Sequence, residues 1–216
     1  MYNYKVVMIM EKVGYEERPK VVVIDKLGGK SYVTFNFGVE PSAEGYSGYS
    51  ATVVFADGKE TADGVLYQLV TFGMIRYVKP EEMNALIQAF PSEDPLSLAK
   101  DYQKERIRSY DSSEAVNQFS INGSPMWLDK ATRAGLKLRL EAERSAGKEN
   151  TTLWYGTEAI TLPVSNAIIM LNRLEIYASE SYDVTQGHLA RVALMESVEE
   201  VLGYDFTEGY PDKLNF

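Results

Sequence analysis

The spacing of apolar residues changes near residue 57, and this change restricts the chain to folds that combine a sheet with helices. Before it, residues 4–13 alternate between a consistently apolar face and a mixed one, and runs rich in β-branched and aromatic residues at 20–25, 31–37 and 49–55 are typical of strands. After it, apolar residues recur at the i, i+3, i+4 spacing of amphipathic helices. We therefore predict an α+β protein, with an N-terminal antiparallel β-rich module with helices, then a compact hairpin-helix-hairpin-helix module.

Glycine and proline residues divide the first module into its expected strands. The pair Gly28-Gly29 lies between two β-branched runs and predicts a tight hairpin turn, because glycine tolerates the positive φ of such turns. Residues 40–48 contain one proline and two glycines and predict a loop. The dipeptide Asp57-Gly58 predicts the turn that ends the last strand.

Capping residues mark the helix boundaries in the middle of the chain. Asp63 is the predicted N-cap of a helix with its apolar residues on one face. Pro80 is predicted to open the next helix, because proline lacks only a donor that has no partner in a first turn. Pro91 is expected to end that helix, and another is expected from residues 92–95 to about residue 108.

A short polar run at residues 109–113 marks the predicted boundary between two domains, 1–108 and 109–216. The second domain is expected to begin with a hairpin on the Asn-Gly pair at residues 122–123. A second hairpin is expected at residues 151–162. The second domain therefore alternates small hairpins with helices.

Two helices complete the second domain. Asp129 is the predicted N-cap of the first, where it shares a helix face with Arg133 and can also pair with its guanidinium, a structural role in either case. Gly147 is the expected C-terminal end of that helix, because glycine accepts the left-handed conformation found there. Pro163 is predicted to open the second helix.

Composition excludes several kinds of site. The chain has no cysteine, which rules out disulfides, thiolate zinc sites and cysteine nucleophiles. It has one histidine, His188, which excludes sites that need two imidazoles. A net charge of -9 opposes nonspecific binding to nucleic acid or anionic membranes, so we expect neither as a partner. The apolar runs are too short to predict a leader peptide or a membrane span.

The remaining polar motifs favour structural roles. His188 and Asp183 resemble a base with its orienting carboxylate, but no nucleophile stands at a diagnostic spacing, so a locally hydrogen-bonded helix position is preferred. Glu196, Glu199 and Glu200 favour a solvated helix face over a metal site, because no histidine or Asp-x-Asp-x-Asp-Gly loop accompanies them. We predict no catalytic residue, no metal ligand and no cofactor.

Aromatic residues are the expected contact residues. The chain has 15 tyrosines and 2 tryptophans, and their large amphipathic rings contribute binding area at low entropic cost. The candidate protein-binding residues are Trp127, Trp154, Tyr177 and Tyr210. For the two tryptophans, packing in the core is the alternative role and the more common one.

Motifs of the second half, among them Trp127-Leu128-Asp129 and Tyr204-Asp205-Phe206, resemble those of an uncharacterised domain family of tailed bacteriophages and prophages. The resemblance covers about residues 111–216, in the form that the domain takes in phages of gut Bacteroidales. Such domains occur at the ends of tail-fibre proteins and in small proteins encoded near tail-fibre genes, and they are more distantly similar to tail-fibre assembly chaperones. The resemblance rests on Ile121-Asn122-Gly123, Trp127-Leu128-Asp129, Thr152-Leu153-Trp154, Leu174-Glu175-Ile176-Tyr177-Ala178, Ser197-Val198-Glu199-Glu200-Val201 and Tyr204-Asp205-Phe206-Thr207-Glu208-Gly209-Tyr210-Pro211.

This resemblance implies a role and not a reaction. We expect a non-enzymatic tail-associated protein, either a virion component near the tail fibre or baseplate or a chaperone of fibre assembly. The expected partner is a tail-fibre or baseplate protein, or another copy of this chain. The expected location is the host cytoplasm during assembly and, for a structural component, the virion.

Two other functions stay open at this point. A phage-encoded inhibitor would bind a host protein through an exposed aromatic surface. A carboxylate-dependent hydrolase would need two carboxylates about 5 to 9.5 Å apart across one cleft. The sequence names no such pair.

Overall fold

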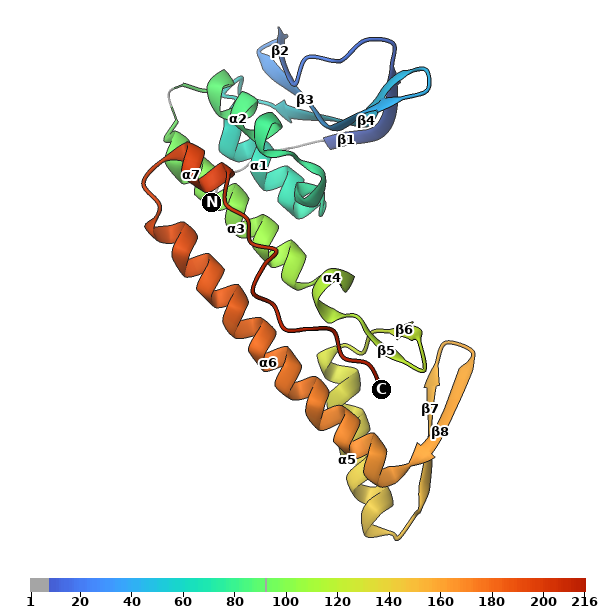
Figure 1. Cartoon of the computed structure of the whole chain (residues 1–216). Helices are drawn as coiled ribbons and strands as arrows, with labels where there is room; N and C mark the ends of the chain where they lie inside the picture. The colour runs from blue at the N-terminus through green and yellow to red at the C-terminus, as the bar shows by residue number, and fades with distance from the viewer. Residues whose placement is uncertain (1–7, 92) are drawn as a thin grey trace. The chain divides into compact units, whose positions relative to one another are not determined.

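The computed structural model describes residues 8–91 and 93–216, and its elements confirm the predicted α+β fold. A four-stranded antiparallel sheet comes first along the chain, and helices and two small hairpins follow (Figure 1). No helix among the described residues is long and apolar enough to cross a bilayer.

The chain folds into two compact units, and each unit takes residues from two stretches of the sequence. Unit 1 consists of Met1–Ser109, as far as it is described, and Leu189–Asp205. Unit 2 consists of Tyr110–His188 and Phe206–Phe216. The two domains expected from the sequence stay a prediction.

The sheet of unit 1 has the strand order β1-β4-β3-β2 with every neighbouring pair antiparallel. Its central strands bury one face: alternate residues of β3 and β4 are inaccessible to solvent and lie directly opposite one another. Residues 4–7, part of the strand expected at 4–13, lie outside the described residues. The strands are β1 (Met8–Tyr15), β2 (Val22–Leu27), β3 (Lys30–Ser42) and β4 (Gly45–Phe55).

The loop expected at residues 40–48 is wrong, because β3 and β4 continue into that segment as a hairpin. Ser42 pairs with Gly45, and Pro41 pairs with Tyr46. Gly45 has a φ of +123°, and a Cβ atom there would lie 2.2 Å from the Tyr15 carbonyl oxygen. Glycine is therefore required at this position for close approach of the backbone, and it does not mark the end of a strand.

A buried carboxylate joins the sheet to a helix of unit 1. The register of β3 shifts between Phe37 and Glu40, where Gly38 has a φ of +59°. Glu82, 1% exposed, accepts hydrogen bonds at this bulge from the backbone N–H groups of Gly38 (2.8 Å) and Val39 (3.1 Å). It also accepts one from the N–H of Lys79 (2.9 Å), at the start of α2. One side chain thus satisfies three backbone donors that no ladder or helix bond reaches.

The helices of unit 1 begin largely where the sequence places them. Pro80 is the first residue of α2, as predicted. The N-cap of α1 is Thr61 and not the predicted Asp63, and Glu93 accepts two further N–H bonds at that end from far along the chain. Figure 1 shows α1 and α2 beside the sheet. The helices are α1 (Ala62–Thr71), the short 3-10 helix η1 (Ile75–Tyr77), α2 (Pro80–Ala89), most of α3 (Pro95–Asp111), the end of α6 (Val164–Leu194) and α7 (Val198–Leu202).

Hydrogen bonds from side chains of α3 hold the later stretch of unit 1 against that helix. Gln103 is fully buried, and its side-chain amide donates to the Tyr204 carbonyl oxygen at 2.7 Å. Lys100 donates to the Ala193 carbonyl oxygen at 2.9 Å. Residues near the end of the chain are therefore part of the same unit as the sheet.

Unit 2 contains the two hairpins that the sequence predicts. Asn122 and Gly123 both have positive φ, which is the geometry of the predicted Asn-Gly turn. Residues 214–216 add to the first hairpin as a short parallel strand beside β5. The elements of unit 2 are α4 (Glu114–Asn117), β5 (Phe119–Ile121), β6 (Ser124–Met126), α5 (Lys130–Ser145), β7 (Asn150–Tyr155), β8 (Glu158–Pro163) and α6 up to residue 188.

Caps and turn residues of unit 2 also follow the sequence. The Asp129 carboxylate accepts from the Thr132 N–H at 2.8 Å and caps α5, as predicted. Gly147 has a φ of +73° just after that helix. Pro163 lies one residue before the helix that it was predicted to open: it ends β8, and α6 begins at Val164.

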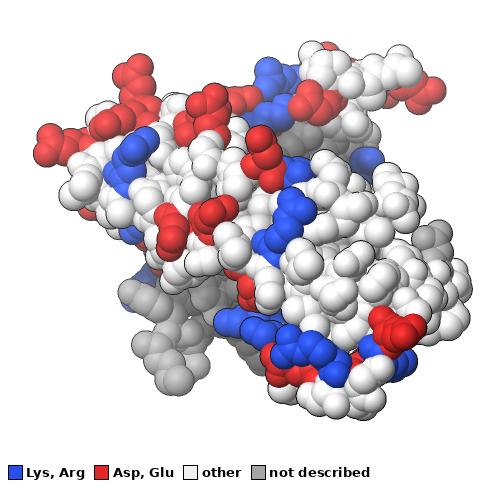
Figure 2. All heavy atoms as spheres, turned by 60° about the horizontal axis from the view of Figure 1, so that its bottom comes forward, with Lys and Arg blue, Asp and Glu red and all other residues white. Residues whose placement is uncertain are grey.

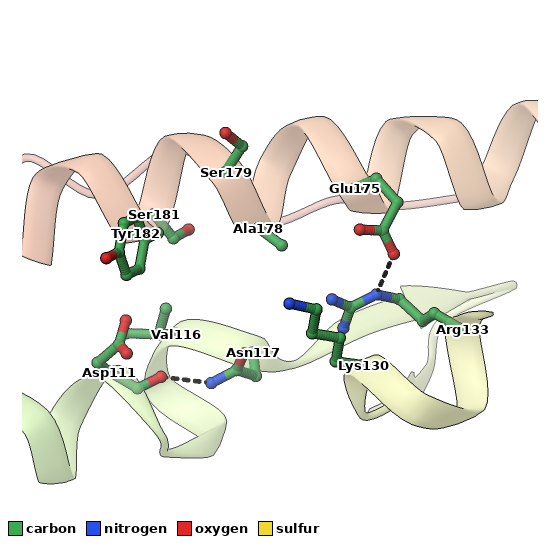
Figure 3. Close-up of a pocket in the computed structure, with 10 residues that line it drawn as sticks. All are labelled: Asp111, Val116, Asn117, Lys130, Arg133, Glu175, Ala178, Ser179, Ser181 and Tyr182. Carbon is green, nitrogen blue, oxygen red and sulfur yellow. Dashed lines mark hydrogen bonds and ion pairs between the residues drawn. The ribbon is translucent and has the colours of Figure 1, made fainter.

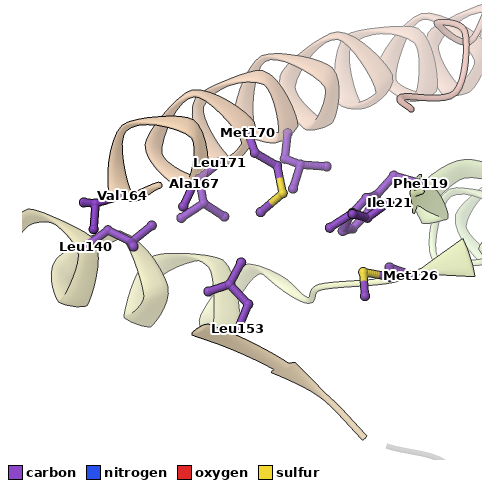
Figure 4. Close-up of a cluster of buried hydrophobic side chains, with 10 residues drawn as sticks. Phe119, Ile121, Met126, Leu140, Leu153, Val164, Ala167, Met170 and Leu171 are labelled. Atoms are coloured by element: carbon purple, nitrogen blue, oxygen red, sulfur yellow. The ribbon is translucent and has the colours of Figure 1, made fainter. Parts of the chain in front are cut away.

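The core of unit 2 is a single apolar cluster between α5, α6 and the two hairpins (Figure 4). Helix α5 contributes only one buried side chain, Leu140, whereas α6 contributes five. The core is therefore organised along α6. Its members are Phe119, Ile121, Met126, Leu140, Leu153, Val164, Ala167, Met170, Leu171 and Leu174.

We predict that unit 1 depends on the carboxylate of Glu82. Replacing Glu82 with Gln leaves one oxygen for three N–H donors and turns an amide N–H₂ group toward one of them, which should destabilise the protein by about 2 kcal/mol. Replacing it with Ala removes both oxygens and should cost about 4 kcal/mol, because a cavity is added. Urea unfolding followed by circular dichroism measures both effects.

The matched control is Glu81→Gln, on the exposed side of the same first turn. We expect it to change the free energy of unfolding by no more than about 0.5 kcal/mol. Equal stability of the Glu82→Gln and Glu81→Gln proteins would contradict the role given to Glu82.

Candidate protein-binding surface

The four predicted contact residues all lie in unit 2, but they differ in exposure. Trp154, on β7, is 68% exposed, and Trp127 is 37% exposed. Tyr177 is 8% exposed, and Tyr210 is half-buried. Core packing, the alternative for the tryptophans, is thus wrong for Trp154, which presents most of its indole ring to solvent.

Tyr177 and Tyr210 make hydrogen bonds inside unit 2. The Tyr177 hydroxyl donates to the Val116 carbonyl oxygen at 2.6 Å, and burial raises the pKa of this phenol. The Tyr210 hydroxyl lies 2.9 Å from that of Thr185, which in turn donates to Asp111 at 2.7 Å. Tyr177 therefore connects α6 to α4, and Tyr210 connects the final segment to α6.

His188 lies on α6, with its Nε2 atom 3.0 Å from the carbonyl oxygen of Glu208. Its ring also packs against that of Tyr210, at 5.8 Å between centroids. These contacts agree with the preferred interpretation of a hydrogen-bonded helix position. Among the described residues, no group of three His, Cys, Asp or Glu side chains is placed to hold a metal ion.

Two residues of the acidic cluster Glu196, Glu199 and Glu200 make local hydrogen bonds at the start of α7. The N–H of Glu200 donates to the Ser197 hydroxyl, which is the N-cap of α7. The Glu200 carboxylate in turn accepts from the N–H of Glu196 at 3.3 Å. These are local contacts that stabilise the start of a helix.

A cavity of about 390 Å³ lies between α4, α5 and α6 in unit 2 (Figure 3). Arg133 lines it and donates to Glu175 (2.7 Å) and to the Leu128 carbonyl oxygen (2.7 Å). In place of the pairing with Asp129 that the sequence allows, Arg133 therefore reaches across to α6, while Asp129 caps the helix. Burial explains the choice, since the Arg133 side chain is only 12% exposed and gains two close partners.

The same cavity contains two carboxylates that the sequence did not bring together, Asp111 and Glu175. They lie toward opposite ends of it (Figure 3). Each one accepts a hydrogen bond from a neighbouring side chain, Asp111 from Thr185 and Glu175 from Arg133. Carboxylates held in this way commonly join helices to one another.

A second depression of about 360 Å³ is lined entirely by uncharged residues, and we call it the uncharged groove. Its floor is the buried side chain of Met170, and its rim includes Ile169, which is 57% exposed. Figure 2 shows a broad area without charged side chains, bordered by residues of both signs. The uncharged groove is formed by Ile121, Asn122, Ile160, Thr161, Leu162, Asn166, Ile169, Met170 and Phe216.

Polar contacts fix the wall of the uncharged groove that the second hairpin provides. Arg139 on α5 donates to the Thr151 hydroxyl and to the Thr152 carbonyl oxygen, both at 2.7 Å. Glu143 pairs with Arg139 (3.2 Å) and with Lys148 (2.7 Å). The hydrogen bond from Lys148, with those from Thr151 and Arg139, lowers the pKa of Glu143 to about 2. This network attaches β7 to α5.

Comparisons with family models, with curated proteins and with solved structures found no match for this chain. The surface is thus described by its own geometry. It combines an uncharged groove, an exposed indole and a hairpin held by charged contacts. Such a combination suits contact with another polypeptide, because apolar surface and aromatic rings dominate the energetics of protein interfaces.

The lowered pKa of Glu143 predicts a pH dependence of stability. Its carboxylate is held near pKa 2 in the folded chain, against 4.5 as the ordinary value, so folding favours the ionised form. The stabilisation is fully present above about pH 4.5 and is lost as the pH falls toward 2. We expect Glu143→Gln to lower the melting temperature at pH 7, with a difference from wild type that shrinks between pH 4.5 and pH 3.

Glu141→Gln is the control, because Glu141 is exposed on the same helix and forms no ion pair within the described part of the chain. Its melting temperature should follow that of the wild type at every pH. A pH-independent deficit for Glu143→Gln would show that its effect comes from packing and not from its charge.

Proposed function

We propose that the chain is a non-enzymatic tail-associated protein of a bacteriophage or prophage, and that unit 2 binds a tail-fibre or baseplate protein. The binding surface is the uncharged groove with the exposed second hairpin beside it. The protein acts either as a virion component near the tail fibre or baseplate or as a chaperone during fibre assembly in the host cytoplasm. The family resemblance supports the context, and the groove supports the binding mode.

The observation that carries the proposal is the exposure of apolar side chains around a depression without charges. Ile169 at its rim is 57% exposed; Trp154 is 68% exposed on the second hairpin, but it does not line the depression and lies on the face of β7 opposite the buried Leu153. Water contact with such groups is unfavourable by about 25 cal/mol per Å² of apolar surface, so their coverage by a partner contributes to binding. Aromatic and aliphatic anchors beside a preformed pocket are typical of interface hot spots.

The charge of the chain fits a partner that recognises a defined patch. Net charge -9 opposes broad association with anionic polymers, while the uncharged groove carries no such barrier. A partner segment that enters the groove must itself be free of charge, because a buried unpaired charge is costly.

The alternative of a phage-encoded inhibitor uses the same surface against a host protein, and it makes a different prediction about location. An inhibitor forms a stoichiometric complex with a host factor and is absent from virions. A carboxylate-dependent hydrolase is the weaker alternative. Asp111 and Glu175 share a cavity, but each is engaged by a neighbouring side chain.

Affinity capture of the tagged chain from infected or induced host cells tests the proposal, together with mass spectrometry of purified virions. Capture of a fibre or baseplate protein with presence in virions identifies a structural component. Capture with absence from virions identifies an assembly chaperone. Capture of a host protein alone rejects the proposal in favour of the inhibitor.

A charge at the rim of the groove should weaken this capture. Ile169→Glu places a carboxylate beside the uncharged lining and should reduce recovery of the tail protein about tenfold or more, as loss of an interface anchor does. Ile176→Glu is the matched control: it lies two turns further along α6, is 60% exposed and does not line the groove. Quantitative mass spectrometry of the captured proteins measures the difference.

Both substitutions replace an exposed side chain, so each should change folding stability by no more than about 0.5 kcal/mol. Equal recovery by the two variants would place the contact surface elsewhere.

A further inference from the structure

One edge of the second hairpin is unpaired. β7 and β8 form a sheet of two strands, and no other described strand pairs with β8. An unpaired strand presents a row of backbone N–H and C=O groups to its surroundings. The groups on the free edge of β8 are therefore available to another extended chain.

The register shows which residues present these groups. A two-residue turn at Gly156 and Thr157 makes Tyr155 and Glu158 the closing pair, and pairs that exchange hydrogen bonds alternate with pairs that do not. By this alternation Ala159 and Thr161 turn their N–H and C=O groups away from β7.

The opposite edge of the hairpin confirms this alternation. Thr152, the cross-strand partner of Thr161, also belongs to a pair without ladder bonds. Its carbonyl oxygen points outward and accepts from Arg139 at 2.7 Å. The Arg139 guanidinium thus occupies part of the outer edge of β7. The backbone carbonyl of Thr161 on β8 has no such partner among the described residues.

Only the middle of the free edge lacks the usual protection against pairing, because β8 begins at Glu158 and ends at Pro163. Proteins commonly guard open edges with lysine, proline, bulges or covering loops. Residues 159–162 read Ala-Ile-Thr-Leu, with no charge, glycine or proline, and they pair with β7 in unbroken register. Such a segment has the composition of a strand inside a sheet.

The uncharged groove lies along this edge and specifies the occupant. Three consecutive residues of β8 line it, so backbone groups and side-chain pockets are presented together. The edge requires an extended backbone, which excludes a helix or a lipid chain as a matching ligand. The lining side chains are uncharged, and the nearby Arg173 guanidinium is stacked on the Phe216 ring at 4.9 Å from its centroid, so an uncharged segment is the matching occupant. A second copy fits less well, because two concave grooves do not fill one another.

The first hairpin already shows this mode of pairing within the chain. Residues 214–216 lie parallel to β5, with N–H to carbonyl bonds of 2.9 to 3.0 Å. Phe216 then packs against Phe119 and lines the uncharged groove. Unit 2 thus completes one small sheet with an added strand, while the other stays open.

We propose that β8 binds an extended, uncharged segment of the partner protein by strand addition, with Ala159 and Thr161 forming the backbone hydrogen bonds and apolar side chains entering the groove. This inference rests on the proposed function for the identity of the partner. It goes further in stating the conformation and chemistry of the bound segment.

Two proline substitutions test the backbone contact. Thr161→Pro removes an N–H that points away from β7, and Thr152→Pro does the same on the opposite edge. Both lose the same contact between the two threonine hydroxyls, which lie 3.0 Å apart. We expect Thr161→Pro to reduce capture of the tail protein about tenfold or more, and Thr152→Pro to stay within about twofold of wild type.

A peptide experiment tests the same edge without the natural partner. The probe is an acetylated and amidated peptide of alternating threonine and valine, and its control has proline in place of each valine. Amide hydrogen exchange followed by NMR should show new protection at Ala159 and Thr161 with the first peptide and none with the second. Ile160 and Leu162, whose N–H groups face β7, should change little.

The outcomes separate this inference from the proposed function. Equal capture of a tail protein by the Thr161→Pro and Thr152→Pro chains overturns strand addition and leaves the proposed function standing. Failure of the wild type to capture any tail protein overturns the proposed function, and protection of Ala159 and Thr161 by the peptide then still supports strand addition. Absence of that protection overturns it. Protection of the same amides on concentration alone, with dimer formation, replaces the partner segment with a second copy.

Discussion

The carboxylate of Glu82 is the contact on which the arrangement of unit 1 depends. Strand β3 needs a bulge at Gly38 to continue into its hairpin with β4, and the bulge frees two N–H donors inside the protein. Burial of unpaired donors would be prohibitive, since each costs about 1 to 3 kcal/mol. Because Glu82 belongs to the first turn of α2, the same carboxylate satisfies the bulge and positions the helix against the sheet.

The same principle recurs wherever regular hydrogen bonding is interrupted. Glu93 satisfies the N-terminal donors of α1, and Arg139 satisfies a carbonyl on the outer edge of β7. In each case a charged side chain from another element takes the place of a missing backbone partner. At the free edge of β8, by contrast, no charged side chain from the described residues takes the place of a backbone partner.

The sequence predicts those features that depend on neighbouring residues. The Asn-Gly turn, the Asp129 cap and the start of α2 at Pro80 are confirmed, because each is decided by a few neighbouring residues, and the fold class is confirmed because the period of apolar residues is itself a local pattern. The loop expected at 40–48 is wrong, since glycine there serves a close approach to β1 that lies far away in sequence. Proline and glycine occur both in loops and in closely packed hairpins, so composition alone does not distinguish a loop from a hairpin at residues 40–48.

In the candidate site too, the sequence predicts local features and misses those that depend on distant residues. The sequence selected Trp154 as a contact residue, but no periodicity could reveal the uncharged groove, whose lining comes from four separate stretches of the chain. Arg133 was placed beside Asp129 by the sequence, but it pairs with Glu175 on α6. Arg133 gains two close acceptors on other segments, Glu175 and the Leu128 carbonyl oxygen, while the Asp129 carboxylate is engaged by Thr132 at the start of α5.

The open edge of β8 also affects how the free chain behaves before it meets a partner. A strand edge whose middle residues are uncharged is a template for edge-to-edge aggregation, and the tendency grows with concentration and with the time spent unbound. On the proposed strand addition, synthesis of the chain together with a partner would keep this edge covered from the start. The solubility of the isolated chain is then a property of one backbone edge, and a single inward-pointing lysine on β8 would be expected to raise it at the expense of binding.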